Sequence, residues 1–279
     1  MAASGPLGAN LQAMKQMFEA GAAAVVTKTI TPEPDQSSGG CIQFGDQMFN
    51  REGYSQRSLP EWEAELDQLR GSRIIANIFA QTPNELAALA KRMVDCGVEV
   101  LELGLSCTTV RQDPVCCDLE KLFLFCKTVR SAVDIPVLVK LQLQTSTKQN
   151  CDMVKTIERT GINGVSFADT VPAVFLHPGD GTLILGGSGG LSGPFLKPLV
   201  LKALYDISFS KLTVVGIGGI REAGDVLDYL RMGASAVQVC TFVLKEGHEA
   251  FKRLVADFSN LMLNFDHRIE TLLKTEVKN

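Results

Sequence analysis

Short hydrophobic runs rich in β-branched residues recur along the whole chain. Segments between them carry apolar residues at helical spacing. Runs with almost no polar interruption are typical of strands that are buried on both faces of a parallel sheet. The runs cover residues 23–27, 74–79, 98–103, 137–141, 164–167, 213–216 and 236–239.

Amphipathic segments that alternate with these runs predict helices at 83–94, 118–129, 152–159 and 222–232. Several of them end in Cys-Gly, Thr-Gly or Met-Gly, and glycine is the common residue just past a helix. A repeated strand-then-helix order predicts parallel pairing through right-handed crossovers. About seven or eight such units fit this length, which favours a parallel (β/α)8 TIM barrel. An open doubly wound sheet is the alternative.

No linker or change in composition divides the chain, so we predict a single domain over residues 1–279. The region 31–60 is polar and contains Gly, Ser, Gln and Pro. It predicts a long loop or a short hairpin. Because long loops after barrel strands usually line the active site, we expect this region to border it.

Composition excludes several classes of function. The net charge of −4 gives no basic field for nucleic acid. No apolar stretch reaches the ~18–20 residues that span a bilayer, and the first residues lack the features of a signal peptide, so we expect a cytoplasmic protein. The eight cysteines form no Cys-x-x-Cys pair and the three histidines lie far apart. We therefore expect neither a metal site nor an iron–sulfur cluster.

Three glycine-containing segments near the end of the chain predict a phosphate site. Residues 185–193 expose backbone N–H groups with few Cβ atoms in the way. In residues 214–220 a strand runs into a glycine turn and a helix start, which directs amides and a helix dipole at an anion. Residues 233–241 end in a small polar pair. Three unrelated turns, the first of them a flexible loop, are the alternative.

Cys107 and two lysines are the candidates for chemistry. Cys107 follows a predicted strand end beside small residues, where a thiol of suited pKa can act as a general base. Lys28 and Lys140 stand at the ends of apolar strands. A lysine there is costly unless it meets an anion, and beside a flavin it would favour reduction. The alternatives are an inert half-buried cysteine and lysines that reach out to water.

The order of these motifs resembles the FMN-dependent dihydroorotate dehydrogenases and the related FMN domain of dihydropyrimidine dehydrogenase. The similarity covers nearly the whole chain and is strongest from Gly190 to Leu244. It rests on Ala3-Ser4-Gly5, Thr27-Lys28-Thr29, Phe49-Asn50, Leu105-Ser106-Cys107, Val139-Lys140-Leu141, Gly190-Leu191-Ser192-Gly193, Gly218-Gly219-Ile220 and Val237-Gln238-Val239-Cys240-Thr241.

The resemblance implies a (β/α)8 barrel with FMN at its C-terminal mouth. It implies that Cys107, as in the cysteine-type members, and Lys28 are the catalytic residues. The implied cofactor-binding residues are Ala3, Ser4, Lys28, Lys140, Gly193, Gly218, Gly219, Cys240 and Thr241. The implied substrate-binding residues are Asn50, Ser106, Asp169 and Thr170.

The chain departs from the family pattern at the ring-binding asparagines. The family usually has Asn at the position of Gly104, Cys-Pro-Asn at Cys107-Thr108-Thr109, and Asn before Thr or Ser at Asp169-Thr170. An Asp in place of Asn removes two donors and adds a charge, which disfavours a nearby orotate carboxylate. The chain also begins inside the first motif, without the short strands that usually precede the barrel, so we expect an open barrel bottom or a misassigned start.

The resulting hypothesis is an FMN-dependent dehydrogenase that acts on the C5–C6 bond of a dihydropyrimidine, as in the conversion of dihydroorotate to orotate. The alternatives are the same fold and cofactor with another cyclic substrate, a non-catalytic flavin-binding paralogue, and a sugar-phosphate barrel enzyme without flavin. The family often forms dimers, so a homodimer is an expectation. No dinucleotide fingerprint is present, so electron transfer to NAD or ferredoxin would need a separate subunit. With a small acid such as fumarate as acceptor, this chain alone would suffice.

Overall fold

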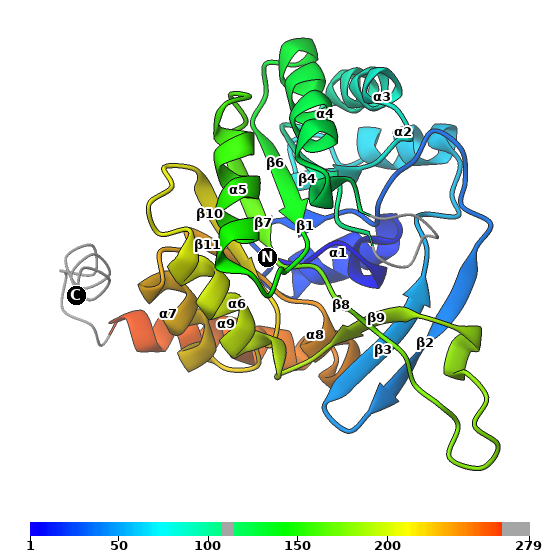
Figure 1. The fold of residues 1–279 in the computed structure, drawn as a ribbon, viewed down its shortest axis with the longest axis vertical. Coiled ribbons are helices and arrows are strands. Elements are labelled where there is room, and N and C mark those ends of the chain that lie inside the picture. Colours follow the sequence, from blue (N-terminus) through cyan, green and yellow to red (C-terminus); the bar gives the residue numbers. More distant parts are fainter. Residues whose placement is uncertain (108–113, 264–279) are drawn as a thin grey trace.

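Seven parallel strands form the central sheet of the computed structural model, which describes residues 1–107 and 114–263 (Figure 1). Their order is β1-β4-β5-β6-β7-β10-β11. All seven coincide with predicted runs, and no strand end differs from its prediction by more than two residues. They are β1 (Val25–Val26), β4 (Ile74–Ile78), β5 (Val100–Gly104), β6 (Val137–Leu141), β7 (Gly164–Phe167), β10 (Thr213–Ile217) and β11 (Ala236–Gln238).

The segment around Ala2 closes the sheet into a barrel. Ala2 pairs in parallel with both Val25 and Val239, next to the two outermost strands. Backbone hydrogen bonds of 3.0 Å run from the N–H of Val26 to the oxygen of Ala2, and from the N–H of Ala3 to the oxygen of Val239. This segment takes the eighth strand position, so the prediction of a (β/α)8 barrel is confirmed and the open sheet is excluded.

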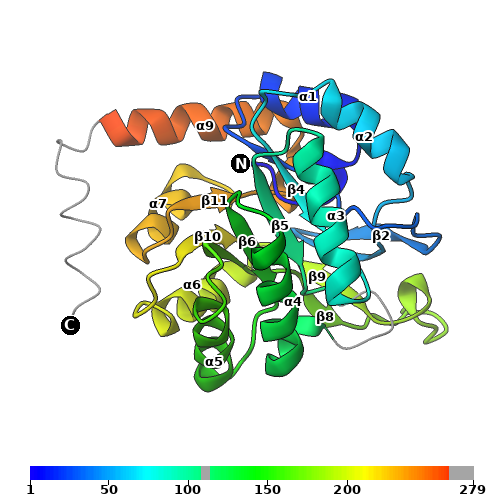
Figure 2. The same cartoon turned by 90° about the horizontal axis from the view of Figure 1, so that it is seen from above.

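Helices surround the barrel (Figures 1 and 2). The four predicted helices are present as α3 (Pro83–Asp95), α4 (Leu119–Ala132), α5 (Thr147–Glu158) and α7 (Ala223–Arg231). The start of α3 follows from its sequence, because Thr82 and Glu85 cap each other's backbone N–H groups at 3.3 and 3.1 Å. The remaining helical segments are η1 (Pro6–Gly8), α1 (Leu11–Glu19), α2 (Leu59–Asp67), η2 (Val115–Cys117), η3 (Ile184–Gly186), α6 (Leu196–Asp206), α8 (Thr241–Glu246) and α9 (His248–Leu263).

A small antiparallel sheet lies beside the barrel, in the order β2-β3-β9-β8. Its strands are β2 (Ser38–Phe44), β3 (Gln47–Glu52), β8 (Val171–Ala173) and β9 (Gly189–Ser192). The region 31–60 was predicted as a long loop or a short hairpin, and the structure shows a hairpin there. The last residues of this region begin α2. The hairpin projects from the barrel together with β8 and β9 (Figure 1).

Two layers fill the inside of the barrel. Apolar side chains that pack as small separate clusters, among them Ile75, Val100 and Leu138, form one layer. Along the same strands, two residues further toward the carboxyl ends, the buried residues Asn77, Glu102 and Lys140 are polar or charged. The other face of the strands packs against the helices in the main core. Burial on both faces explains the near-continuous hydrophobic runs, and the polar layer marks the end where the site lies.

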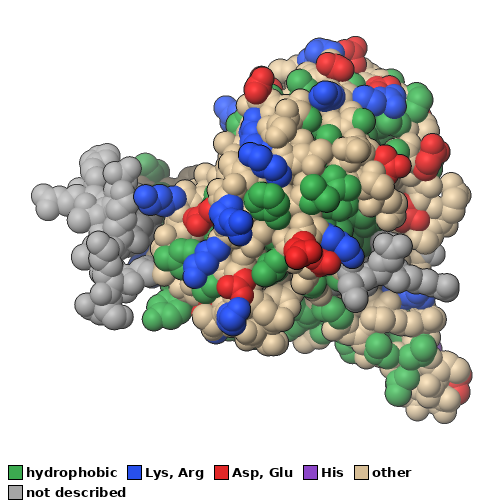
Figure 3. All heavy atoms as spheres, turned by 45° about the horizontal axis from the view of Figure 1, so that its top comes forward, with side chains coloured by type: hydrophobic (Ala, Val, Ile, Leu, Met, Phe, Trp, Pro, Cys, Tyr) green, Lys and Arg blue, Asp and Glu red, His purple; other side chains and the backbone are tan. Residues whose placement is uncertain are grey.

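Lys, Arg, Asp and Glu side chains lie among one another on the face drawn in Figure 3, without a large area of one sign. Among the described residues, no helix has the length and apolar character that crossing a membrane requires. In the same part of the chain, no three His, Cys, Asp or Glu side chains are grouped as metal ligands.

Candidate active site

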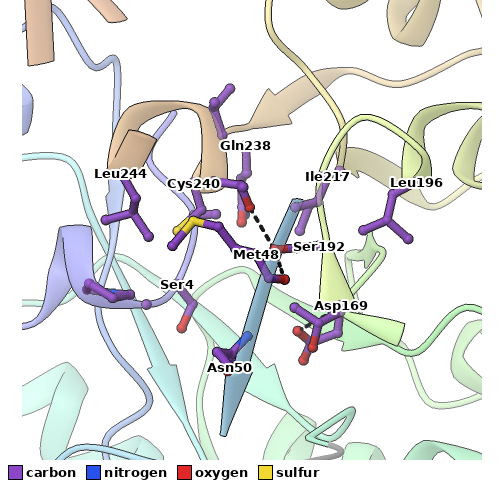
Figure 4. Close-up of a pocket in the computed structure, with 18 of the residues that line it drawn as sticks. Ser4, Met48, Asn50, Asp169, Ser192, Leu196, Ile217, Gln238, Cys240 and Leu244 are labelled. Atoms are coloured by element: carbon purple, nitrogen blue, oxygen red, sulfur yellow. Dashed lines mark hydrogen bonds between the residues drawn. The ribbon is translucent and has the colours of Figure 1, made fainter. Parts of the chain in front are cut away.

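A cavity of about 420 Å³ lies at the carboxyl ends of the barrel strands. This is within the usual range for sites that hold a small molecule or cofactor. The barrel supplies most of its wall, and Met48, Asn50 and Glu52 of strand β3 line it from the antiparallel sheet. Figure 4 shows Met48 and Asn50 facing the same space as Asp169, Gln238 and Cys240.

Thirteen of the fourteen residues that the sequence assigns to the site line this one cavity. Ser106 is the exception, because it is buried behind Asp169 and donates a hydrogen bond of 2.7 Å to its Oδ2. Thr108 and Thr109 lie outside the described residues. The lining residues are Ala3, Ser4, Lys28, Asn50, Cys107, Lys140, Asp169, Thr170, Gly193, Gly218, Gly219, Cys240 and Thr241.

Two lysines stand in ion pairs at the cavity wall. Lys28 Nζ lies 2.7 Å from Glu52 Oε2, and Lys140 Nζ lies 3.4 Å from Asp169 Oδ1. Burial alone would lower the pKa of the Lys140 ammonium, but the carboxylates of Asp169 and Glu102 outweigh it and hold the pKa above its usual value. Lys140 is therefore a fixed positive charge beneath the cavity.

Glu102 is a central residue that the sequence interpretation missed. It is fully buried. Its Oε1 accepts from Asn77 Nδ2 at 2.7 Å, and its Oε2 accepts from Ser166 Oγ at 2.6 Å and Gln238 Nε2 at 3.0 Å. A charged residue inside an apolar strand is costly without partners. The argument that singled out Lys140 therefore applies to Glu102 as well.

The glycine turn after β10 is open for an anion. Gly218 and Gly219 have φ angles of +121° and +71°, which favour glycine. A Cβ on Gly219 would lie 2.7 Å from the backbone nitrogen of Lys197. Within the described residues, the N–H groups of Gly219 and Ile220 donate to no protein acceptor. The predicted phosphate cradle at this turn therefore has free donors.

The first glycine segment differs from its prediction. Residues 189–192 are not an open cradle, because they form strand β9 and pair with β3. A Cβ on Gly189 would lie 2.4 Å from the backbone oxygen of Asn50, and one on Gly190 would lie 2.1 Å from Thr170 Oγ1. These glycines allow close strand packing, and of the segment 185–193 only Ser192 and Gly193 line the cavity.

Asp46, in the turn of the β2–β3 hairpin, forms ion pairs with two basic side chains at the end of the cavity where the glycine turn after β10 lies. Its carboxylate lies 2.6 Å from Lys245 Nζ and 3.0 Å from Arg221 Nη1. The hydrogen bond from Lys245 and the charge of Arg221 lower the pKa of Asp46. The hairpin turn is thereby tied to the barrel beside the glycine turn.

Three cysteines line the cavity, namely Cys41, Cys107 and Cys240. Burial raises the pKa of the Cys240 thiol to about 12, so it stays protonated and cannot act as a base near neutral pH. Cys107 instead forms a hydrogen bond with the hydroxyl of Tyr54. Burial first, and then Cys107, raise the pKa of Tyr54 above its usual value. The Tyr54 hydroxyl therefore stays protonated beside Cys107.

The fold and the cavity define a (β/α)8-barrel enzyme with its site at the carboxyl ends of the strands. The family model described as dihydroorotate dehydrogenase matches residues 1–262, and this chain belongs to that family.

Proteins named dihydroorotate dehydrogenase B (NAD(+)), catalytic subunit, are similar to it along most of their length. The protein of Methanocella arvoryzae is 32% identical over 88% of this chain and 82% of its own. That of Pyrococcus abyssi is 31% identical over 93% and 88%. Among solved structures, DHODH from Eimeria tenella in complex with ferulenol has the same fold, with a TM-score of 0.80, 19% identity and coverage of 94% and 80%.

Replacing Lys140 by Met should destabilise the fold, because Asp169 and Glu102 lose their shared cation. We expect a loss of roughly 2–3 kcal/mol in urea unfolding, below the 3–5 kcal/mol of a fully buried pair because Asp169 is partly exposed. Because the folded-state pKa of Lys140 is raised, the contribution should be complete below the ordinary lysine pKa of about 10.4 and disappear only above the raised value.

The double variant K140M/D169N should recover part of this loss, since it removes one of the two carboxylates. K148M is the matched control, because Lys148 pairs with Asp152 on the surface, where such pairs contribute little. A K140M protein as stable as wild type would show that the pair is not needed for the fold.

Proposed function

We propose that this protein is an FMN-dependent oxidoreductase that removes two hydrogens from the C5–C6 bond of a dihydropyrimidine of the dihydroorotate class. The observation that carries the proposal is the convergence of Lys28, Cys107, Lys140 and the Gly218–Gly219 turn on one cavity, in a chain of the dihydroorotate dehydrogenase family. A sugar-phosphate enzyme would explain the turn, but it would not explain a thiol and two lysines at the same cavity.

The residues present fit FMN on three counts. The N–H groups of Gly219 and Ile220 are free donors for a phosphate. Lys140 and Lys28 supply positive charge along the wall, which favours the reduced, anionic form of a flavin ring. The buried oxygens of Asn77 and Gln238 have no partner within the described residues, as expected where a ligand supplies N–H groups. We propose that Ala3, Ser4, Gly193, Cys240 and Thr241 complete the cofactor site.

In the proposed reaction Cys107 is the general base. Its thiolate takes the proton from C5 of the ring, and the Tyr54 hydroxyl donates to the thiolate beforehand. FMN, when bound, supplies the acceptor for the hydride that leaves C6. Asn50, Thr170 and Asp169 hold the ring, and Ser106 fixes the Asp169 carboxylate from behind. The antiparallel sheet covers the cavity with Met48 and Asn50 and limits the access of water.

Reoxidation requires a further acceptor. The relatives from Methanocella arvoryzae and Pyrococcus abyssi are named as catalytic subunits of an NAD(+) enzyme. This supports a separate electron-transfer subunit as a partner of the present chain. A cytoplasmic homodimer and one functional domain over residues 1–279 stay predictions.

Purified protein should take up one FMN and show a flavin absorption spectrum. G219A should weaken FMN binding at least tenfold, because the added Cβ forces the turn open and displaces its donors. G71A is the matched control, since Gly71 has a similar φ of +78° and open space around it. Isothermal titration or flavin fluorescence measures both constants. A colourless wild type that takes up no FMN contradicts the proposed function.

C107A should slow the reduction of bound FMN by a dihydropyrimidine about 10²–10⁴-fold, the usual contribution of a positioned base. FMN binding should stay unchanged, because other residues hold the cofactor. Anaerobic stopped-flow absorbance measures the reduction. C117A is the control, since Cys117 lies outside the cavity lining. An FMN-loaded C107A protein that is reduced at the wild-type rate would remove Cys107 from the mechanism, and an inactive wild type would favour the non-catalytic paralogue.

A second candidate, a substrate without the orotate carboxylate, is favoured by the Asp169 carboxylate at the cavity wall. Asp169 is held by Ser106, by Lys140 and by its contact with the N–H of Thr170 at 2.8 Å. We expect D169N to raise kcat/KM for dihydroorotate relative to dihydrouracil about tenfold, roughly 1.4 kcal/mol, because a like charge is removed. D46N removes a carboxylate from the other end of the cavity and should leave the ratio unchanged. An unaltered ratio in D169N would contradict a role of Asp169 in this choice.

A further inference from the structure

Two cysteines that are neighbours in the sequence lie outside the cavity, in the short helix η2 next to the end of β5. Cys116 is fully buried, whereas Cys117 is exposed. The backbone holds both in place, because the N–H of Cys116 donates to the oxygen of Leu105 at 3.1 Å and the N–H of Cys117 donates to the oxygen of Pro114 at 2.9 Å. A buried thiol is therefore kept beside an exposed one.

The loop that follows β6 surrounds the two sulfur atoms with polar groups. Cys117 Sγ lies 3.4 Å from Gln142 Oε1 and 3.6 Å from Gln144 Nε2. Cys116 accepts a hydrogen bond from the backbone N–H of Gln142, and its thiol also makes a hydrogen bond with Cys117. The two sulfurs therefore meet in one polar place, unlike the apolar surroundings of an inert structural cysteine.

The two thiols differ in what can reach them. Cys117 is exposed, and Gln144 Nε2 donates to its sulfur, which stabilises negative charge on the sulfur when it reacts as a nucleophile. Cys116 is shielded from solvent, and the hydrogen bond with Cys117, followed by burial, raises the pKa of its thiol. A small oxidant would therefore meet Cys117 first, and Cys116 would be the adjacent thiol that reacts second.

A disulfide between these two residues would be strained. Neighbouring Cα atoms lie about 3.8 Å apart across a trans peptide, while disulfides usually join Cα atoms about 4.4–6.8 Å apart. The backbone hydrogen bonds of η2 would have to rearrange to form it. Because strained disulfides are easily reduced, such a bond here would be a reversible modification and not a structural crosslink.

We propose that Cys117 and Cys116 are a reversible redox site that reacts with a peroxide. The Cys117 sulfur attacks one oxygen of hydrogen peroxide, the O–O bond breaks, and the sulfur becomes a sulfenic acid while the other oxygen leaves as water. The Cys116 sulfur then attacks the Cys117 sulfur, the S–O bond breaks, and the hydroxyl leaves as water with the Cys116 proton. Two thiols and one peroxide thus give one disulfide and two waters. The site does not depend on the proposed function, since it needs neither flavin nor substrate.

The test treats the reduced full-length protein with one equivalent of hydrogen peroxide. Trypsin releases a peptide of residues 112–121 that contains both cysteines and no other. A disulfide within the pair lowers its mass by two hydrogens and joins it to no other peptide. We expect this change, its reversal by dithiothreitol, and a rate at least about tenfold above that of the same protein in urea, where the polar surroundings are lost.

Variants separate the two thiols. C116S should stop at a sulfenic acid on Cys117, which dimedone traps, and C117S should leave the peptide without oxidation. Q144L should slow the reaction about threefold or more, because it removes the donor to the Cys117 sulfur. C151S is the matched control and should react at the wild-type rate. Cys151 is also partly buried and donates to the oxygen of Asp206 at 3.4 Å, but no cysteine stands next to it in the sequence.

Three results overturn the proposal. One is a wild-type peptide 112–121 that stays reduced while Cys151 is oxidised. Another is a disulfide that joins Cys117 to Cys107, which would appear as two linked peptides. The third is oxidation that is no faster in the folded protein than in urea. Urea unfolding checks that each variant is folded, and mapping of the wild type decides where a variant is not.

Discussion

Closure of the strands into a ring is the constraint on which the rest of this structure depends. Parallel strands in a closed barrel all end at one rim, so residues from distant parts of the sequence meet there. Lys28, Cys107, Lys140 and Cys240 lie at the carboxyl ends of four different strands and line one cavity for this reason. The closure itself depends on few contacts, the backbone hydrogen bonds of residues 1–3 with β1 and with Val239 after β11.

The fold could be predicted from the sequence because both faces of each strand are buried. The apolar runs were therefore nearly continuous, and the alternation with helices fixed parallel pairing. The glycine segment 185–193 could not be predicted in this way. Gly189 and Gly190 look like an anion loop, but they serve close packing of β9 against β3, and that partner lies 140 residues away in the sequence. Composition alone cannot distinguish a glycine that frees an amide from one that admits a neighbouring backbone.

The missed part of the site is the layer below the cavity. Asn77, Glu102, Ser166 and Gln238 each look like a single polar residue in an apolar strand, and no local spacing connects them. Only the closed barrel brings β4, β5, β7 and β11 around one carboxylate. A general physical signal did exist, since a buried Glu needs donors. The partners of such a residue become identifiable only when the strand order is known.

The charges around the cavity decide where an anion can enter. Among the described lining residues, Lys28, Lys140, Arg221 and Lys245 each face a protein carboxylate. Asp46 lies on an exposed hairpin turn, and under the proposed function its two cations would be shared with a phosphate at the free N–H groups of the glycine turn. Asp169 is fixed by Ser106 and by backbone, and cannot move away at similar cost. The two ends of the cavity therefore differ in how firmly their carboxylates are held in place. Under the proposed function, the glycine-turn end holds the charged group of the cofactor, and the end at Cys107 and Asp169 holds the ring of the substrate.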